Sequence, residues 1–275
     1  ALKILYTDIE ASVFTVLRFI AISVLASFSL IILVKKSQLK QFKTNDLLIF
    51  LSGGFFAFCS YQYFLLNGIS RTPIFLASVL ISISPLFAVI FSAVLKIEKA
   101  SWNMWVGTIL ALFGIAIFKN GFDLTTLWQS LLNSGSGELY CLGSAVSWAS
   151  YTMITKHQVY RDYKHEQQFA FSVIFSTLIL FVFYYDEMIS FDYRAFNLEL
   201  IAYGVYTVIF PIFLAYKLYN KAVQTIGVER TIIYIYLVPI LSGLIAALMS
   251  IDTFTGVKLL GSVIVIAGVI LAKRR

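Results

Sequence analysis

The sequence predicts an all-α polytopic membrane protein made of two inverted five-helix repeats, and three observations lead to this fold class. Of the 275 residues, 60% are hydrophobic and only 13% are charged, whereas soluble domains carry about 25% charged residues. The apolar residues lie in runs of about 18 to 25, which is enough to cross a hydrocarbon core about 30 Å thick. The second half of the chain also repeats the pattern of the first half.

The repeat becomes visible when the sequence is compared with itself at a shift of 154 positions. The shift needs no gap, and it aligns a proline, an acidic turn residue and two glycines with their counterparts. The aligned pairs are Ile81 and Ile235, Pro85 and Pro239, Ala93 and Ala247, Ile97 and Ile251, Glu98 and Asp252, Gly107 and Gly261, and Gly114 and Gly268.

Nine spans are expected in chain order. The first ends before Lys35-Lys36, a charged turn at Lys96–Lys99 separates the third from the fourth, and a Ser/Gly-rich loop at 133–137 precedes the fifth. The expected ranges are 11–34, 47–67, 73–95, 101–118, 138–156, 166–185, 198–219, 228–250 and 254–272.

Four spans precede the Ser/Gly loop and five follow it. Under the shift, the span 138–156 pairs with residues at and before Ala1. We therefore expect ten helices in the natural protein, with most of helix 1, about 15 to 20 residues, absent from this chain. The first repeat is expected at 1–118, a connecting loop at 119–137 and the second repeat at 138–275.

Charge predicts the orientation. When successive loops are assigned to alternate sides, one side collects 15 of the 21 Lys and Arg residues, and the basic side of a membrane protein is cytoplasmic. The expectation is a multi-pass protein of the cell (inner) membrane with both termini in the cytoplasm. Because each repeat has an odd number of helices, the two copies must insert in opposite directions, as in many secondary transporters.

Other functions find little support. The net charge of +7 lies mostly in loops and reflects topology, so no nucleic-acid partner is expected. Cys59 and Cys141 fall inside spans, and His157 and His165 share one loop without further ligand-type residues, so neither a disulfide framework nor a metal is expected. Since no phosphate-binding loop and no nucleophile–base pair appears, we expect no enzyme and no cofactor.

Four motifs stand out in the two halves of the sequence. They are Val16-Leu17-Arg18-Phe19, Pro85 to Glu98 followed by Trp105-Val106-Gly107 and Gly114, Pro239 to Asp252 followed by Gly261 and Gly268, and Gly143-Ser144-Ala145-Val146-Ser147-Trp148-Ala149. Together these motifs resemble the drug/metabolite transporter superfamily, in its EamA-type ten-helix branch. The resemblance implies ten helices in two inverted halves and the export or exchange of small metabolites. One departure is that Ser172 stands where the first repeat has Arg18.

Arg18 is the one full charge placed well inside a predicted span. A charge at that depth is costly unless it faces a cavity, a partner or an interface. Two interpretations stay open. The side chain either reaches the headgroups or pairs with Asp8 or Glu10, or it faces the transport pathway.

Pro85 and Pro239 remove a backbone donor at matched positions within two predicted helices. Each is either a static kink or a hinge for gating. Ser78 and Ser82 precede Pro85 on roughly the same helical face, and we expect them to line a polar cavity.

Aromatic residues supply the remaining cavity candidates. Trp148 and Tyr151 share one face of the span 138–156 with Thr152, and Tyr61 and Gln62 interrupt the span 47–67. Tyrosines near mid-span need a partner for the phenol, which a cavity supplies. The expected substrate-cavity residues are Arg18, Tyr61, Gln62, Ser78, Ser82, Trp148, Tyr151, Tyr206 and Tyr236.

Small residues form a stripe on two of the helices, Gly107 with Gly114 and Gly261 with Gly268. Such stripes permit close helix contact. We expect them to pack within the fold. A monomer is expected, with a homodimer left open.

These features favour a secondary transporter of a small, amino-acid-like or amphipathic metabolite, moved by alternating access through a central cavity between the repeats. No Asp or Glu lies deep in a predicted span, which favours exchange or facilitated movement over ion coupling. The alternatives are exchange of a cofactor-like or nucleotide-like metabolite, with Arg18 as an anion contact, or a membrane scaffold that does not transport. The expected partners are a small-molecule substrate and the lipid bilayer.

Overall fold

The computed structural model describes residues 11–33, 42–72, 77, 80–96, 101–120, 123, 125, 129, 135–193, 198–238, 240–241, 244, 248 and 255–273. Across these ranges the secondary structure is helical, with no strand, which confirms the all-α class. Four helices there are long and apolar enough to cross a membrane, namely Ser12–Ile32, Thr44–Arg71, Glu166–Phe183 and Leu200–Ile226. Shorter apolar helices cover Ser84–Val94, Trp102–Phe118 and Gly256–Ala272.

The chain divides into two compact units, and each unit takes segments from both halves of the sequence. Unit 1 contains Ala1–Ser60 and Ile154–Thr225, and unit 2 contains Tyr61–Met153 and Ile226–Arg275. The chain therefore crosses from unit 1 to unit 2 in the middle of the span 44–71.

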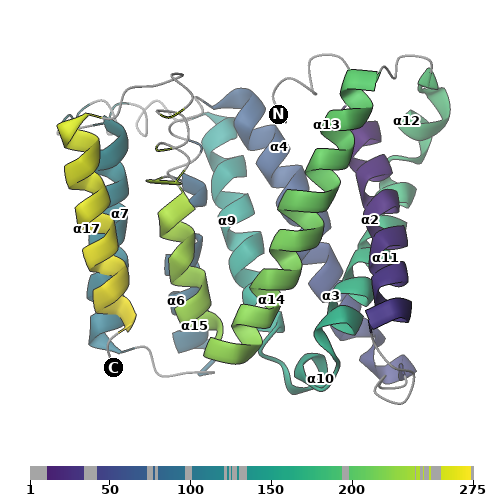
Figure 1. The fold of residues 1–275 in the computed structure, drawn as a ribbon, viewed down its shortest axis with the longest axis horizontal. Coiled ribbons are helices and arrows are strands. Elements are labelled where there is room, and N and C mark those ends of the chain that lie inside the picture. The colour runs from purple at the N-terminus through teal and green to yellow at the C-terminus, as the bar shows by residue number, and fades with distance from the viewer. Residues whose placement is uncertain are drawn as a thin grey trace. The chain divides into compact units, whose positions relative to one another are not determined.

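Unit 1 is organised around two packed helices, α2 and α11. Its elements are α2 (Ala11–Leu33), η2 (Thr44–Asp46), α3 (Leu47–Gly54), η3 (Phe55–Ser60), α10 (Gln158–Arg161), α11 (His165–Phe183), α12 (Tyr185–Ser190), α13 (Leu198–Val208), η5 (Ile209–Leu214) and most of α14 (Ala215–Ile226). α3 packs on α11, and α13 packs on α2 (Figure 1).

The packing of α2 on α11 reproduces the sequence repeat. The hydroxyls of Ser23 and Thr177, which lie 154 positions apart, are hydrogen-bonded at 2.7 Å. Residues related by the shift therefore meet each other, as residues near a local twofold axis do. Near the start of α2, Phe14 packs with Leu200 and Phe191, and Phe191 follows the end of α12. The start of α2 thus lies beside the segment that follows α11, so the two helices run in opposite directions.

Unit 2 contains a second pair of repeat-related helices, α7 and α17, which lie side by side (Figure 1). Its elements are α4 (Tyr61–Arg71), α6 (Ser84–Val94), α7 (Trp102–Asn120), nearly all of α9 (Ser136–Ile154), α15 (Val228–Ile232), η6 (Ile233–Leu237) and α17 (Gly256–Lys273). α6 and η6 also pack on α7, and α15 packs on α6.

Small residues bring α7 and α17 close together. A Cβ on Gly107 would lie 2.5 Å from the Gly268 carbonyl oxygen, and one on Gly268 would lie 2.6 Å from the backbone nitrogen of Ala111. A Cβ on Gly114 would meet the Val265 nitrogen at 2.6 Å, again too close for any side chain. The prediction that the glycine stripes pack within the fold is confirmed.

The third predicted span, 73–95, is broken. Its described part contains a turn at Ser82–Ile83, and α6 starts at Ser84, with Pro85 in its first turn. The missing N–H of proline costs nothing at that position. In the second repeat, the shifted positions of this turn fall in η6, which is a 3₁₀ helix. Both copies therefore leave the α-helical form just before the matched proline position, and Pro239 itself lies outside the described residues.

Two spans also contain π-helices that the sequence did not predict. These are η3 in the span 44–71 and η5 in the helical run 198–226, which is longer than the predicted 198–219. Pro211 in η5 was the available sequence signal for the second one. The residues of η3 carry no such signal.

Candidate functional site

Three of the predicted cavity residues form one row of rings in unit 2. Tyr61 at the start of α4 contacts Trp148 of α9, with ring centroids 5.4 Å apart. Trp148 contacts Tyr151 at 5.6 Å. Tyr61 and Trp148 are half-buried, and Tyr151 is buried. We call Tyr61, Trp148 and Tyr151 the aromatic row, and it takes residues from both sequence repeats.

The close approach of α4 and α9 positions the aromatic row. A Cβ on Gly68 would lie 2.6 Å from the Cys141 sulfur, and one on Gly143 would lie 2.9 Å from the Phe64 ring. Glycine is therefore required at two levels of this helix pair. The small-residue run at 143–147, noted in the sequence, is what allows the two helices to bring these rings together.

The hydroxyls of α9 are satisfied by their own helix. Thr152 Oγ1 donates to the Trp148 carbonyl at 2.6 Å, and Ser147 Oγ donates to the Gly143 carbonyl at 2.8 Å. Both side chains are buried, so these hydroxyls belong to the packing of α9 and are not exposed beside the row.

Gln62 follows Tyr61 on α4 and is buried, with an exposed fraction of 6%. Its Oε1 has no hydrogen-bond partner within the described part of the chain. Buried polar atoms are normally paired, so Gln62 supplies a further acceptor in the helix that carries Tyr61.

Arg18 lies in unit 1 and is 4% exposed. Its guanidinium carbon lies 5.8 Å from the centroid of the Phe14 ring, on the same helix. The side chain is therefore held among protein groups. Asp8 and Glu10, its two suggested partners, lie outside the described residues.

The sequence interpretation missed a second cation inside an apolar helix. Lys217 of α14 donates through Nζ to Ser29 Oγ at 2.8 Å and lies 5.0 Å from the Phe213 ring centroid. Lys217 falls near the end of the predicted span 198–219, where its charge was counted with the basic side. The described helix continues to Ile226, so Lys217 lies well inside it.

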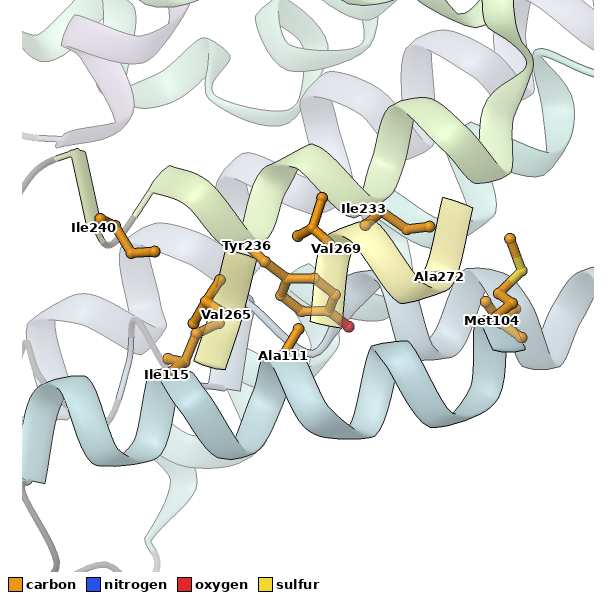
Figure 2. Packing of buried hydrophobic residues seen from close by; sticks show 10 residues of the cluster. Met104, Ala111, Ile115, Ile233, Tyr236, Ile240, Val265, Val269 and Ala272 are labelled. Carbon is orange, nitrogen blue, oxygen red and sulfur yellow. The ribbon is translucent and has the colours of Figure 1, made fainter. Parts of the chain in front are cut away.

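Tyr236 and Tyr206 have opposite surroundings. Tyr236 is fully buried in a cluster built from α6, α7, η6 and α17. Figure 2 shows its ring among Ala111, Val265 and Val269. This packing accounts for the position of the ring, and a role for Tyr236 in a cavity stays a prediction.

Tyr206 is 53% exposed and lies against Phe210 at 5.3 Å. Exposed apolar residues surround it in sequence at Ile201, Val205 and Ile209. Such a face suits contact with lipid. Its assignment to a cavity also stays a prediction.

The remaining candidates belong to the broken helix. Ser82 is buried in the turn before α6. Ser78 and Pro239 lie outside the described residues, so only Pro85 of the two proposed hinges is placed.

A polar network in unit 1 was also missed. The Tyr163 hydroxyl donates to Asp46 Oδ2 at 2.6 Å, and both residues are buried. Gln168 donates through Nε2 to the carbonyls of Tyr160 and Tyr163, and accepts from Gln224 at 2.7 Å. Burial, and then the hydrogen bond to Asp46, raise the pKa of Tyr163 to about 12. The network ties the loop before α11 to the start of α3 and to α14.

Within the described residues, no group of three or more His, Cys, Asp or Glu side chains is arranged to hold a metal ion. The aromatic row carries ring faces, two phenol hydroxyls and the Trp148 indole N–H, and Gln62 Oε1 is an acceptor in the helix that carries Tyr61.

Comparison with known proteins gives a consistent result. The EamA-like transporter family matches residues 1–119 and 135–274. An uncharacterized transporter, YdfC, of Bacillus subtilis (strain 168) is 24% identical over 249 residues, covering 89% of this chain and 77% of that protein. An uncharacterized transporter of Archaeoglobus fulgidus is 25% identical over 236 residues, covering 86% of this chain and 81% of the relative. A solved crystal structure shares the fold with a TM-score of 0.74 at 18% identity, covering 99% of this chain and 91% of that chain.

Proposed function

Because the chain belongs to the EamA-like transporter family, we propose that it is a secondary transporter that moves a small organic metabolite by alternating access. Two relatives are named as transporters. The charge distribution supports a place in the cell (inner) membrane with both termini in the cytoplasm. Transport, and not catalysis, is the activity to test.

The observation that carries the proposal is the aromatic row. It combines Tyr61 of the first repeat with Trp148 and Tyr151 of the second, so a ligand that contacts these rings touches both repeats. Half-buried rings suit an amphipathic metabolite with an apolar or aromatic part. The phenol hydroxyls and the Gln62 amide oxygen suit its polar groups, an N–H donor among them. An amino-acid-like compound has this chemistry.

The test is an uptake measurement on proteoliposomes that contain the purified protein. The vesicles are loaded with a pool of amino acids, and the uptake of amino acids from outside is measured. Replacing Trp148 by Ala removes the central ring, and we expect uptake to fall about fivefold to tenfold, the loss that about 1–1.5 kcal/mol of ring contact corresponds to. Trp148→Phe should retain most of the uptake. Trp102→Ala is the matched control, because Trp102 is 77% exposed at the start of α7.

Equal uptake by Trp148→Ala and Trp102→Ala would remove the aromatic row from the substrate site. An absence of uptake for every compound, with folded protein in the vesicles, would favour the scaffold. Uptake that accumulates substrate only under a proton gradient would contradict exchange or facilitated movement.

A second candidate class rests on Arg18. A buried cation in an apolar helix suits an anionic substrate, such as a nucleotide-like or cofactor-like metabolite. In the same vesicles, a phosphorylated metabolite pool tests this class. Uptake of such a compound that Arg18→Gln abolishes, and Trp148→Ala spares, would favour it over the amino-acid-like class.

A further inference from the structure

The two π-helices lie at repeat-related positions. η3 covers Phe55–Ser60 and η5 covers Ile209–Leu214, so both their first and their last residues differ by the repeat shift of 154. Both belong to unit 1. π-Helices are rare, and they occur frequently at functional sites, so two of them at matched positions point to a shared role.

The cause of the π conformation differs between the copies. η5 contains Pro211, which has no N–H and whose ring would clash with the Thr207 carbonyl in a regular α-helix. The residue at the same place in η3 is Ala57. The proline in η5 therefore opposes an α-helical conformation, whereas no residue of η3 does so.

Contacts from other elements hold η3 instead. The Tyr216 hydroxyl donates to the Ala57 carbonyl at 3.0 Å, and Cys59 Sγ donates to the Ser176 carbonyl at 3.4 Å. The Tyr216 ring is buried and lies 4.6 Å from the Phe58 ring. Helices in membranes tolerate irregular backbone where side chains supply hydrogen bonds to it, and the Tyr216 hydroxyl supplies one to η3.

A conformational change in η3 would directly affect the residues that follow it in the chain. η3 is the last segment of unit 1 before the chain enters unit 2 at Tyr61. Converting a π-helix to an α-helix changes the register by one residue, and one residue corresponds to a rotation of about 100° around the helix axis. Tyr61, the first residue after η3, belongs to the aromatic row.

We propose that η3 is a switchable π-helix, held by the Tyr216 hydroxyl and released to α-helix during transport, whereas Pro211 keeps η5 permanently in the π form. Tyr216 is thus a positioning residue that acts on Tyr61 through the backbone of η3. The role in transport rests on the function proposed above. The switch itself does not, because it can be measured without a substrate.

Cys59 lies inside η3 and serves as the reporter. Cys59 is 6% exposed and its thiol donates to the Ser176 carbonyl, so alkylation by N-ethylmaleimide should be slow in a Cys141→Ala background. Tyr216→Phe keeps the ring and removes the hydroxyl. We expect it to raise the alkylation rate of Cys59 about fivefold or more, as the loss of a hydrogen bond to a buried carbonyl implies.

Ala57→Pro gives η3 the proline that η5 has at the matched position. This variant shows whether the effect of Tyr216→Phe comes from the switch or from a packing defect. Added to Tyr216→Phe, it should return the alkylation rate to that of the parent, because proline then opposes the α-helical form. Cys141, tested in a Cys59→Ala background, is the control site in α9, and its rate should not respond to Tyr216→Phe.

An unchanged Cys59 rate in Tyr216→Phe, or no rescue by Ala57→Pro, overturns the proposal. If Tyr216→Phe fails to fold, Ala57→Pro alone decides: it should slow Cys59 alkylation below the parent rate, and an equal rate overturns the switch. Failure of Ala57→Pro to fold also overturns it, since η3 would then not accommodate the proline that η5 contains. The expected labelling pattern without uptake of any compound would instead count against the transport function.

Discussion

Four tyrosines in similar apolar stretches have four different surroundings. Tyr61 joins the aromatic row, Tyr206 is exposed, Tyr236 lies in a packed core, and Tyr216 holds a backbone carbonyl. The sequence suggested a cavity for Tyr61, Tyr206 and Tyr236 and did not include Tyr216 among the cavity candidates. It could not separate them because an aromatic side chain on a membrane helix can face lipid, protein or a cavity, and its place in the sequence does not show which. The partner of each ring also comes from a distant part of the chain.

Tyr163 yields a stability prediction at the level of one hydrogen bond. Tyr163→Phe removes the donor to buried Asp46, and we expect it to cost about 1–3 kcal/mol of unfolding free energy. The raised pKa of Tyr163, about 12 against an ordinary value of 10, means that folding favours the protonated phenol. Its contribution is therefore complete below pH 10 and is lost as the pH rises through about 12.

Thermal unfolding in detergent micelles, followed by circular dichroism over a range of pH, measures the stability of the parent and of Tyr163→Phe. The difference in Tm between the parent and Tyr163→Phe should be constant below pH 10 and shrink above it. Asp46→Asn combined with Tyr163→Phe should recover part of the loss, because a neutral amide costs less to leave unpaired than a carboxylate. A Tm difference that grows with pH would contradict the assignment.

At the scale of elements, the sequence predicted which segments are helical, and the structure shows where those helices are irregular. α2 (Ala11–Leu33) and α11 (His165–Phe183) match their predicted spans within two residues, because long apolar runs set helix length in a membrane. The turn before Pro85 and the π form of η5 each follow from a proline. η3 could not be predicted, because its conformation depends on a hydroxyl from α14.

The packing of α7 on α17 gives a prediction for an element pair. Gly268→Ala would place a Cβ 2.6 Å from the Ala111 backbone nitrogen and 2.7 Å from the Gly107 carbonyl oxygen. Neither backbone atom can move without displacing its helix, so we expect a loss of about 1–3 kcal/mol in stability. Thermal unfolding of the purified protein checks this.

Gly256→Ala is the matched control in the same helix. A Cβ on Gly256 meets nothing within 4 Å, and alanine is the better helix former, so its Tm should equal or slightly exceed that of the parent. Equal Tm values for Gly268→Ala and Gly256→Ala would show that α7 and α17 have room to separate.

At the scale of the whole chain, the sequence shift predicted the repeat, and the contact between Ser23 and Thr177 follows the same shift. The division into compact units was not predicted, since each unit takes segments from both halves. A comparison of a sequence with itself reveals which residues are equivalent but not which of them touch. The motif-based resemblance to EamA-type transporters is confirmed by the family match over most of the chain.

An inverted repeat makes equivalent positions face opposite sides of the membrane, and the pair Lys36 and Ser190 tests this directly. The two positions differ by 154, and Ser190 is exposed at the end of α12. Lys36 belongs to the basic set that charge predicts to be cytoplasmic. In a background without Cys59 and Cys141, a membrane-impermeant maleimide should label Ser190→Cys in intact cells and Lys36→Cys only after permeabilisation. Labelling of both from one side would contradict the inversion, and the reverse pattern would keep the inversion but overturn the cytoplasmic assignment of the basic side.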